Sequence, residues 1–370
     1  MQLLTGLYSG KKRKDNKTMK KALSMILALC MILALCACGQ SAAPAESKTE
    51  PAAADTAADN TVTAEVEPFV MKMNLTVGNN DPQYPLWESF KEHLEEASQG
   101  TVKVELYTGQ TLGTNDEITQ ACASGAEFIN VPDFAGLVDY SADASIYHVP
   151  YLIQKPEQIS DLWKSEIGRG IDAEIAENGI HVISAMYFGT RNVISKIPIE
   201  TADDFKSIKL RVGTSKMWTF TAEALGANAT NTPWSETYQA LSQGIADACE
   251  SPSTLLYSSK LYETCKYLVK TEHLVCNSAV IMSQAVYDSL PDVAKNAIDE
   301  VGDWFAAETI TFSSALADEY DQKLVDEGVQ ISEIDKTPFI EYSKNNVEAA
   351  FPEWSEGLYQ NAYNFLYGEA

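Results

Sequence analysis

The chain has 370 residues, of which 27 are Lys or Arg and 52 are Asp or Glu, giving a formal net charge of −25. So acidic a chain is a poor nucleic-acid binder, because phosphate contacts need clustered Lys and Arg, and anionic membrane surfaces repel it as well. Hydrophobic residues make up 45% of the chain, which is ordinary for a soluble globular protein, and the length suits two domains or one large divided one.

The first 37 residues have the three parts of a secretory signal peptide: a basic start, a short apolar run and a small-residue end. The run at 22–37, ALSMILALCMILALCA, carries no charge and is marginal in length for a permanent membrane helix. Met19 begins a complete leader by itself, so we expect translation to start there. An uncleaved anchor is the alternative interpretation.

The leader ends in Leu35-Cys36-Ala37-Cys38, which is similar to a bacterial lipobox. This resemblance implies cleavage before Cys38 and lipidation of its thiol. Residues 39–67 contain no aromatic residue and are rich in Ala, Thr, Glu and Pro, a composition that predicts a disordered tether. We therefore expect a folded body outside the cytoplasm, held at the bacterial cell membrane by lipid alone, with a net charge of −31 from Cys38 onward.

From residue 69 the pattern alternates between strands and helices. Strands are predicted at 69–77, 101–107, 128–131, 180–187 and 209–212, and helices at 86–97 and 115–123, the second capped by Asn115. Residues 280–282 read as a short return strand, 291–328 as one long helical tract broken only by Gly302, and 339–367 as terminal helices. This order predicts an α/β fold with at least one largely parallel sheet, in which the long helix links two lobes.

The sequence lacks the common enzyme motifs: a phosphate loop, a dinucleotide-binding turn, a nucleophile elbow and a zinc-binding HExxH. We therefore expect no catalytic residues, no cofactor and no metal site. Four cysteines follow Cys38, and the sequence leaves open whether they form disulfides or remain thiols. They are Cys122, Cys249, Cys265 and Cys276.

Several ordered motifs resemble the DctP-type solute receptors of tripartite ATP-independent periplasmic (TRAP) transporters. They are FGTR at 188–191, ADDFKSIKLRV at 202–212, EALGA at 223–227, PWSETYQALSQGIADACESP at 233–252, LPDVAK at 290–295 and GQTLGTNDEITQACASGAEF at 109–128. The resemblance covers about residues 69–345. It implies a two-lobed fold bridged by a long helix, with one lobe at 69–188 plus 277–316 and the other at 189–276 plus 317–370.

Arg211 is the first candidate for ligand binding, because the resemblance places the family's carboxylate-gripping arginine at this position. A planar guanidinium donates two parallel hydrogen bonds to one carboxylate, which lysine cannot do. Arg191 follows the strand that begins at residue 180 and is expected to face the cleft, although a structural ion pair is the alternative. Trp234 matches an aromatic residue that lies against the ligand in the family, and core packing is its alternative.

Four further candidates are Glu250, Ser251, Asn79 and Asn115. The family often has QENP where this chain has CESP at 249–252, so Ser251 stands in place of an asparagine that touches the ligand. The identity of the ligand therefore cannot be transferred from relatives. Ala135 stands where the sialic-acid branch carries a basic residue, which disfavours sialic acid.

The leading hypothesis is a monomeric receptor that binds a small organic acid between its lobes and delivers it to TRAP membrane subunits for uptake driven by an ion gradient. A surface sensor that passes the bound state to a signalling protein would have the same fold and pocket. An extracellular enzyme on a two-lobe scaffold is the third alternative, and the missing motifs argue against it.

Overall fold

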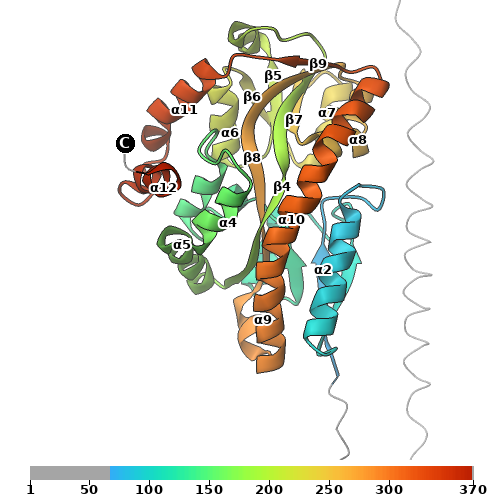
Figure 1. The fold of residues 1–370 in the computed structure, drawn as a ribbon, viewed down its shortest axis with the longest axis vertical. Helices are drawn as coiled ribbons and strands as arrows, with labels where there is room; N and C mark the ends of the chain where they lie inside the picture. The colour runs from blue at the N-terminus through green and yellow to red at the C-terminus, as the bar shows by residue number, and fades with distance from the viewer. Residues whose placement is uncertain (1–66, 369–370) are drawn as a thin grey trace, which may run out of the picture. The chain divides into compact units, whose positions relative to one another are not determined.

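The computed structural model describes residues 67–368, so the predicted leader, the lipidation site at Cys38 and the tether lie outside the described residues (Figure 1). In chain order the elements are β1 (Phe69–Asn74), α2 (Tyr84–Ala97), β2 (Val102–Tyr107), α3 (Asn115–Ala123), β3 (Phe128–Asn130), α4 (Glu157–Lys164), α5 (Glu166–Glu177), β4 (Ile180–Ser195), β5 (Lys209–Val212), α6 (Lys216–Ala224), β6 (Asn228–Asn231), α7 (Thr237–Ser242), β7 (Ala248–Ser251), α8 (Ser253–Ser258), β8 (Tyr267–Ser283), α9 (Gln284–Ser289), α10 (Asp292–Asp326), β9 (Gln330–Glu333), α11 (Thr337–Ala350) and α12 (Leu358–Tyr367).

Within the described residues the strands form one nine-stranded sheet in the order β2-β1-β3-β8-β4-β7-β5-β6, with β9 paired to β8. Parallel pairs lie at both ends, where β1 pairs with β2 and β3, and β5 pairs with β6 and β7. The centre is antiparallel, because β8 pairs with β3 and β4, and β4 pairs with β7. The expectation of a largely parallel sheet thus holds for the two ends, and the sheet as a whole is mixed.

The two halves of the molecule are built on the two parallel ends of this sheet. We call the part around β1–β3 lobe I and the part around β5–β7 lobe II. Strands β4 and β8 run through both lobes as a ribbon, paired from Ile180 opposite Ser283 to Ser195 opposite Tyr267 (Figure 1). The exact residues at which one lobe passes into the other remain a prediction.

The ribbon strands are longer than the sequence indicates, since 180–187 and 280–282 cover only their lobe I parts. The apolar pattern of β4 is interrupted at Gly189, where φ is +118° and a Cβ atom would lie 2.8 Å from Cβ of Pro252. The pairing continues past this point through shifts of register at Tyr187/Gly189 and Arg191/Val193. Such bulges re-aim side chains within a continuous strand. Arg191 therefore lies inside β4, whereas the sequence predicted that it would lie at the end of a strand.

Helix α10 confirms the long helix expected from the sequence, and its 35 residues form one helix that spans roughly 50 Å. It packs along β4, against α2 in lobe I and against α8 in lobe II. Gly302 does not interrupt it. A Cβ atom there would lie 2.0 Å from the carbonyl oxygen of Ile183, and the Gly302 carbonyl accepts a hydrogen bond of 2.7 Å from Ser184. Glycine therefore permits the close crossing of helix and strand.

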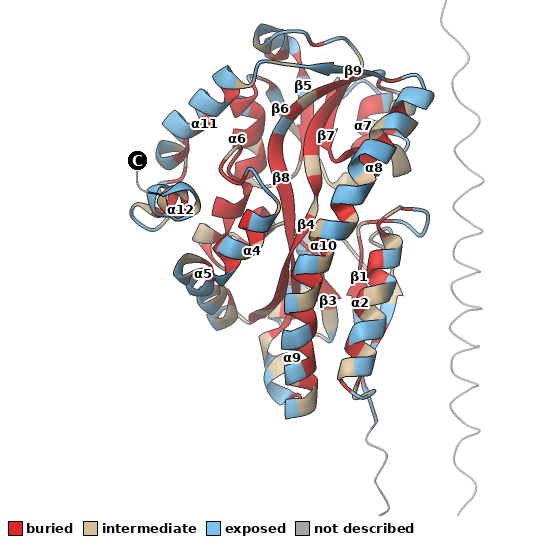
Figure 2. Cartoon of the chain, viewed as in Figure 1, coloured by how far each residue is buried: buried red, intermediate tan, exposed pale blue. Residues whose placement is uncertain are grey.

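Large aromatic side chains fix α10 to lobe I. The ring centroids of Trp87 and Phe90, both from α2, lie 5.2 and 4.9 Å from that of Phe305 on α10. All three side chains are almost completely buried, and Figure 2 shows burial concentrated on the sheet and on the inward faces of the surrounding helices. The terminal helices α11 and α12 confirm the prediction for residues 339–367.

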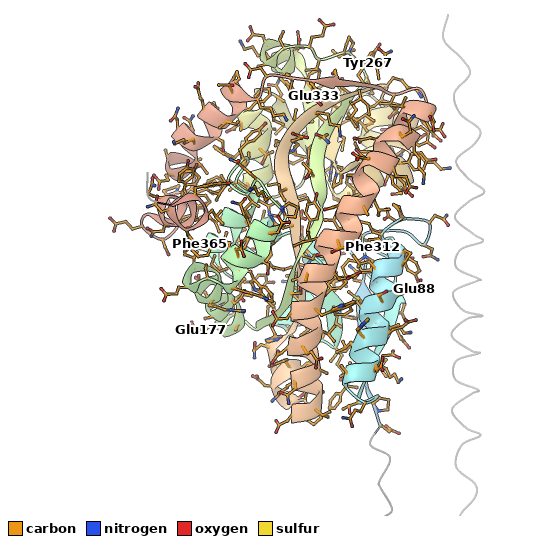
Figure 3. The ribbon with its side chains drawn as sticks, in the orientation of Figure 1. Glu88, Glu177, Tyr267, Phe312, Glu333 and Phe365 are labelled. Atoms are coloured by element: carbon orange, nitrogen blue, oxygen red, sulfur yellow. The ribbon has the colours of Figure 1, made fainter. Side chains whose placement is uncertain are left out.

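The acidic side chains lie mainly on the surface of the described part of the chain, as Figure 3 shows for Glu88, Glu177 and Glu333.

The four cysteines of the body are buried free thiols, which settles the alternative that the sequence left open. None of the described helices combines the length and apolar character that a membrane crossing needs.

Candidate functional site

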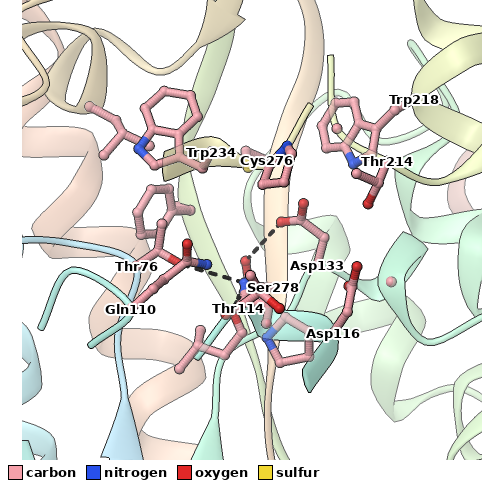
Figure 4. A pocket seen from close by; sticks show the side chains of 18 of the residues that line it. Thr76, Gln110, Thr114, Asp116, Asp133, Thr214, Trp218, Trp234, Cys276 and Ser278 are labelled. Carbon is pink, nitrogen blue, oxygen red and sulfur yellow. Dashed lines mark hydrogen bonds between the residues drawn. The ribbon is translucent and has the colours of Figure 1, made fainter. Parts of the chain in front are cut away.

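A cavity of about 260 Å³ lies between the two lobes, beside the carboxyl ends of the parallel strands of each lobe. Its wall is formed by segments that directly follow strands: 75–77 after β1, 131–133 after β3, 213–215 after β5 and 232–234 after β6. Ligands of open α/β sheets bind beside the carboxyl ends of parallel strands. The position of the cavity thus follows from the topology, and Figure 4 shows its side chains.

Arg211 lies at the carboxyl end of β5, between β6 and β7, and only 3% of its surface is exposed. Its Nε donates to the hydroxyl of Thr232 at 3.3 Å, and Nη2 donates to the Thr232 carbonyl. The guanidinium carbon lies 5.2 Å from the centre of the Trp234 ring. Among residues 67–368, no Asp or Glu forms an ion pair with Arg211, so this buried cation faces the cavity without a protein counter-charge.

Arg191 also lines the cavity, but its charge is already matched. Its Nε donates to one carboxylate oxygen of Glu250 on β7, and Nη2 donates to the other oxygen at 2.8 Å. Nη1 lies 3.2 Å from Sγ of Cys276, and the guanidinium carbon lies 4.6 Å from the centre of the Trp218 ring. The structural ion pair that the sequence left as an alternative is therefore present, and Arg191 also faces the cavity.

Glu250 is completely buried and holds Arg191 from behind. Burial alone would raise the pKa of Glu250, but the charge of Arg191 and hydrogen bonds from His273 and Arg191 lower it well below its ordinary value. The same carboxylate offsets the effect of burial on Arg191 and raises the pKa of that guanidinium. The pair is thus fully charged at neutral pH and adds no net charge to the cavity.

Two tryptophans, Trp218 and Trp234, line the cavity on the lobe II side (Figure 4), and each lies against one of the two arginines. Trp234 lines the cavity beside Arg211, as the sequence places it. Trp218, in the first turn of α6, was not among the candidates of the sequence analysis. Gly213 leaves room for its indole, because a Cβ atom there would lie 2.4 Å from the ring. The close approach of Gly213 to its ring, which only the structure shows, identifies this residue.

The remaining candidates divide between the cavity wall and its surroundings. Asn115 lines the cavity, and its Nδ2 donates to the Val131 carbonyl at 3.2 Å. It does not cap α3 as predicted: the cap is Thr114, whose hydroxyl accepts from the backbone of Glu117 in a capping box. Asn79 is exposed and lies outside the wall, where it accepts a hydrogen bond from Thr108.

Glu250 and Ser251 are also absent from the wall of the cavity. Both lie on β7 and are fully buried, and the Ser251 hydroxyl has no partner among the described residues. Pairing with β4 on one side and β5 on the other encloses this strand, which explains why the CESP segment does not reach the ligand space. Direct contact of these two residues with a ligand remains a prediction that their positions do not favour.

Lobe I contributes polar residues that the sequence analysis did not single out. Asp133 and Asp116 line the cavity, the first after β3 and the second in the first turn of α3. Asp133 accepts a hydrogen bond of 3.4 Å from Ser278, and its carboxylate lies 3.9 Å from Nε2 of the buried His148. Carboxylates are so frequent in this sequence that only the fold distinguishes these two.

The geometry suits a small anion and gives no indication of a metal. Besides Arg211, the amino-terminal end of α6 opens on the cavity at Ser215, and helix amino termini favour negative charge. Within the described part of the chain, no group of three or more His, Cys, Asp or Glu side chains is placed to hold a metal ion.

Comparison with known proteins agrees with this geometry. Residues 73–353 match the family DctP, described as bacterial extracellular solute-binding protein, family 7. The fold is similar to a TRAP periplasmic solute binding protein from Fusobacterium nucleatum with bound sn-glycerol-3-phosphate. That similarity has a TM-score of 0.76 and 34% sequence identity, and it covers 80% of this chain and 97% of the other.

Two further similarities point the same way. A TRAP periplasmic solute binding protein from Ochrobacterium anthropi with bound L-fuconate has a TM-score of 0.78 at 29% identity, covering 81% of this chain and all of that one (100%). The sialic acid-binding periplasmic protein SiaP of Vibrio cholerae is 28% identical over 276 residues, which are 73% of this chain and 85% of SiaP. The chain belongs to the DctP family of bacterial extracellular solute-binding proteins.

Proposed function

We propose that this protein binds one small organic acid in the cavity between its lobes, with the carboxylate of the acid held by Arg211. The observation that carries this proposal is a buried guanidinium that lines the cavity and forms no ion pair with any carboxylate of residues 67–368. A charge so placed is costly unless a counter-ion arrives, and a carboxylate supplies both the charge and two acceptors.

The ligands of the relatives support an acid as the cargo. The Fusobacterium and Ochrobacterium proteins hold sn-glycerol-3-phosphate and L-fuconate, and the Vibrio protein binds sialic acid. All three ligands carry an anionic group, although their remaining parts differ. For this chain the relatives thus support a small organic anion as the class of ligand.

The family and the leader support a proposal for the wider role. We propose a monomer, lipid-anchored through Cys38, that closes on its ligand and delivers it to TRAP membrane subunits. Closure by rotation of the lobes about the β4–β8 ribbon and α10 is the transition expected of a two-lobed receptor. In this role the protein releases its ligand unchanged and is not an enzyme.

Native mass spectrometry of the purified folded chain, followed by calorimetric titration with a panel of acids, tests the proposal. The panel contains aliphatic monocarboxylates, hydroxylated monocarboxylates, dicarboxylates and phosphate monoesters. We expect a co-purified small acid, or saturable 1:1 binding of at least one panel member, with no chemical change in the recovered ligand. Absence of binding by every acid, or turnover of a bound acid, would contradict the proposal.

A further inference from the structure

The cavity has a charge asymmetry that binding of a carboxylate alone does not explain. The lobe II side presents Arg211 and the amino terminus of α6, whereas the lobe I side presents Asp133 and Asp116, whose carboxylates are directed into the cavity in Figure 4. We propose that these two carboxylates select the far end of the ligand, so that the protein takes monocarboxylic acids rich in hydroxyl groups and rejects acids with a second negative charge. This inference rests on the proposed function and adds the class of acid to it.

No described cation beside Asp133 cancels its charge at close range. Its hydrogen-bond partner is the neutral hydroxyl of Ser278, 3.4 Å away, and its nearest basic neighbour is Nε2 of His148 at 3.9 Å. Burial lowers the pKa of His148 to about 4, so this imidazole is uncharged at neutral pH. Asp133 therefore presents a negative charge to whatever occupies the cavity.

The balance of charge around the cavity favours a ligand with one negative charge. The charged residues that line it are two arginines and two aspartates, Arg191, Arg211, Asp116 and Asp133. Glu250, buried behind the wall, already pairs with Arg191. One carboxylate on the ligand would neutralise Arg211. A second anionic group would then meet Asp116, Asp133 and an arginine whose charge Glu250 already balances, and like charges juxtaposed in an interface cost several kcal/mol.

Hydrogen bonding leads to the same class of ligand. An ionised carboxylate only accepts hydrogen bonds, so the far end of the ligand has to bring donors to Asp133 and Asp116. Hydroxyl groups donate and also accept, which suits the other polar residues of this side, namely Thr76, Gln110 and Thr114. A second carboxylate or a phosphate brings acceptors only, and an aliphatic chain brings neither donors nor acceptors.

Calorimetric titration with matched pairs of acids tests the inference. D-gluconate with D-glucarate, and D-galactonate with galactarate, differ only in the last carbon, which is a primary alcohol in the first acid of each pair and a second carboxylate in the other. Hexanoate lacks the hydroxyls, and sn-glycerol-3-phosphate serves as a dianion with hydroxyls. We expect at least one of the two aldonates to bind about 10-fold or more tighter than its dicarboxylate partner, than hexanoate and than the phosphate ester, which corresponds to about 1.4 kcal/mol.

Two variants connect this preference to the carboxylates. Asp133→Asn and, at an exposed position, Asp116→Asn should each reduce the ratio of aldonate to dicarboxylate affinity by at least about threefold, chiefly by strengthening dicarboxylate binding. Asp139→Asn removes the same charge from an exposed residue outside the cavity wall and should leave the ratio unchanged. Thermal melts establish that the variants fold.

Equal or tighter binding of the dicarboxylates or the phosphate ester by the native protein would overturn the inference while the proposed function stands. A ratio that neither aspartate variant moves would overturn it as well. Tighter binding of a zwitterionic amino acid than of any aldonate would show that the carboxylates select an ammonium group and not hydroxyls. If no acid of any class binds, the proposed function itself falls.

Discussion

Arg191 and Glu250 form a closed pair across strands β4 and β7, with Nη2 of the arginine 2.8 Å from Oε1 of the glutamate and both residues buried. This pairing separates the roles of the two arginines in the cavity wall. Glu250 balances the charge of Arg191 and fixes its position in the cavity wall, whereas Arg211 forms no ion pair with any carboxylate of residues 67–368. We therefore expect a ligand carboxylate to pair with Arg211 and not with Arg191.

Substitution of Glu250 should chiefly lower the free energy of unfolding. Glu250→Gln leaves the guanidinium of Arg191 buried without its counter-charge, and breaking one side of a buried ion pair costs about 3–5 kcal/mol. Urea unfolding at pH 7 measures this loss. Glu88→Gln on the exposed face of α2 removes the same charge and should change the midpoint little. A loss below about 1 kcal/mol in Glu250→Gln would contradict the role assigned to the pair.

The stability of the protein should depend on pH through His148. Burial lowers the pKa of His148 from 6.5 to about 4, so between these values the unfolded chain binds a proton that the folded chain does not. The contribution is complete above pH 6.5 and is lost as the pH falls toward 4, amounting to about 3 kcal/mol over the whole window. His273 acts in the same direction, because burial lowers its pKa too.

A comparison of variants isolates this contribution from opposing groups. Burial raises the pKa of Asp172 to about 7, so its contribution has the opposite sign and is lost as the pH rises through that value. His148→Leu removes a ring whose two nitrogens have no hydrogen-bond partner among the described residues. Unfolding free energies measured between pH 4 and 7 should fall less steeply with acidification in this variant than in the native protein. Parallel curves for the two proteins would contradict the burial of a neutral imidazole.

The crossing of α10 and β4 predicts contrasting effects for two glycines. Gly302→Ala places a methyl group where the carbonyl oxygen of Ile183 now lies 2.0 Å away, so helix and strand have to move apart, at a cost of about 1–3 kcal/mol or more. Gly170→Ala, at an exposed position in α5 with no atom within 4 Å of the new Cβ, should stabilise by up to about 1 kcal/mol. Thermal or urea unfolding of both variants measures the difference, and equal effects would contradict the close crossing.

The fold was largely predictable where local periodicity decides the structure. The strand at Lys209–Val212 and the long helix after Pro291 lie where the sequence predicts them, and the helix at Asn115–Ala123 does so through its first-turn acidic residues, although its cap is Thr114. The central ribbon was not predictable to its full length. The pattern of β4 breaks at Gly189 and Arg191, and only pairing with β8 carries the strand across the bulges.

The site was predictable only in part, for a related reason. Arg211, Arg191, Trp234 and Asn115 stand in the cavity wall as their motifs place them. The partnership of Arg191 with Glu250 joins residues 59 positions apart, which spacing along the chain does not reveal. Asp133 and Asp116 are two among 52 acidic residues, and only the meeting of the strand ends singles them out.

The central claim is that Arg211 anchors the ligand carboxylate, and calorimetric titration of Arg211 variants with the tightest-binding acid of the panel tests it most directly. Arg211→Ala and Arg211→Lys should each weaken binding by at least about 100-fold, because lysine keeps the charge but not the two parallel donors. Arg169→Gln removes one positive charge from an exposed site away from the cavity and should bind as the native protein does. Folded Arg211 variants that retain affinity within about threefold of the native value would contradict the account.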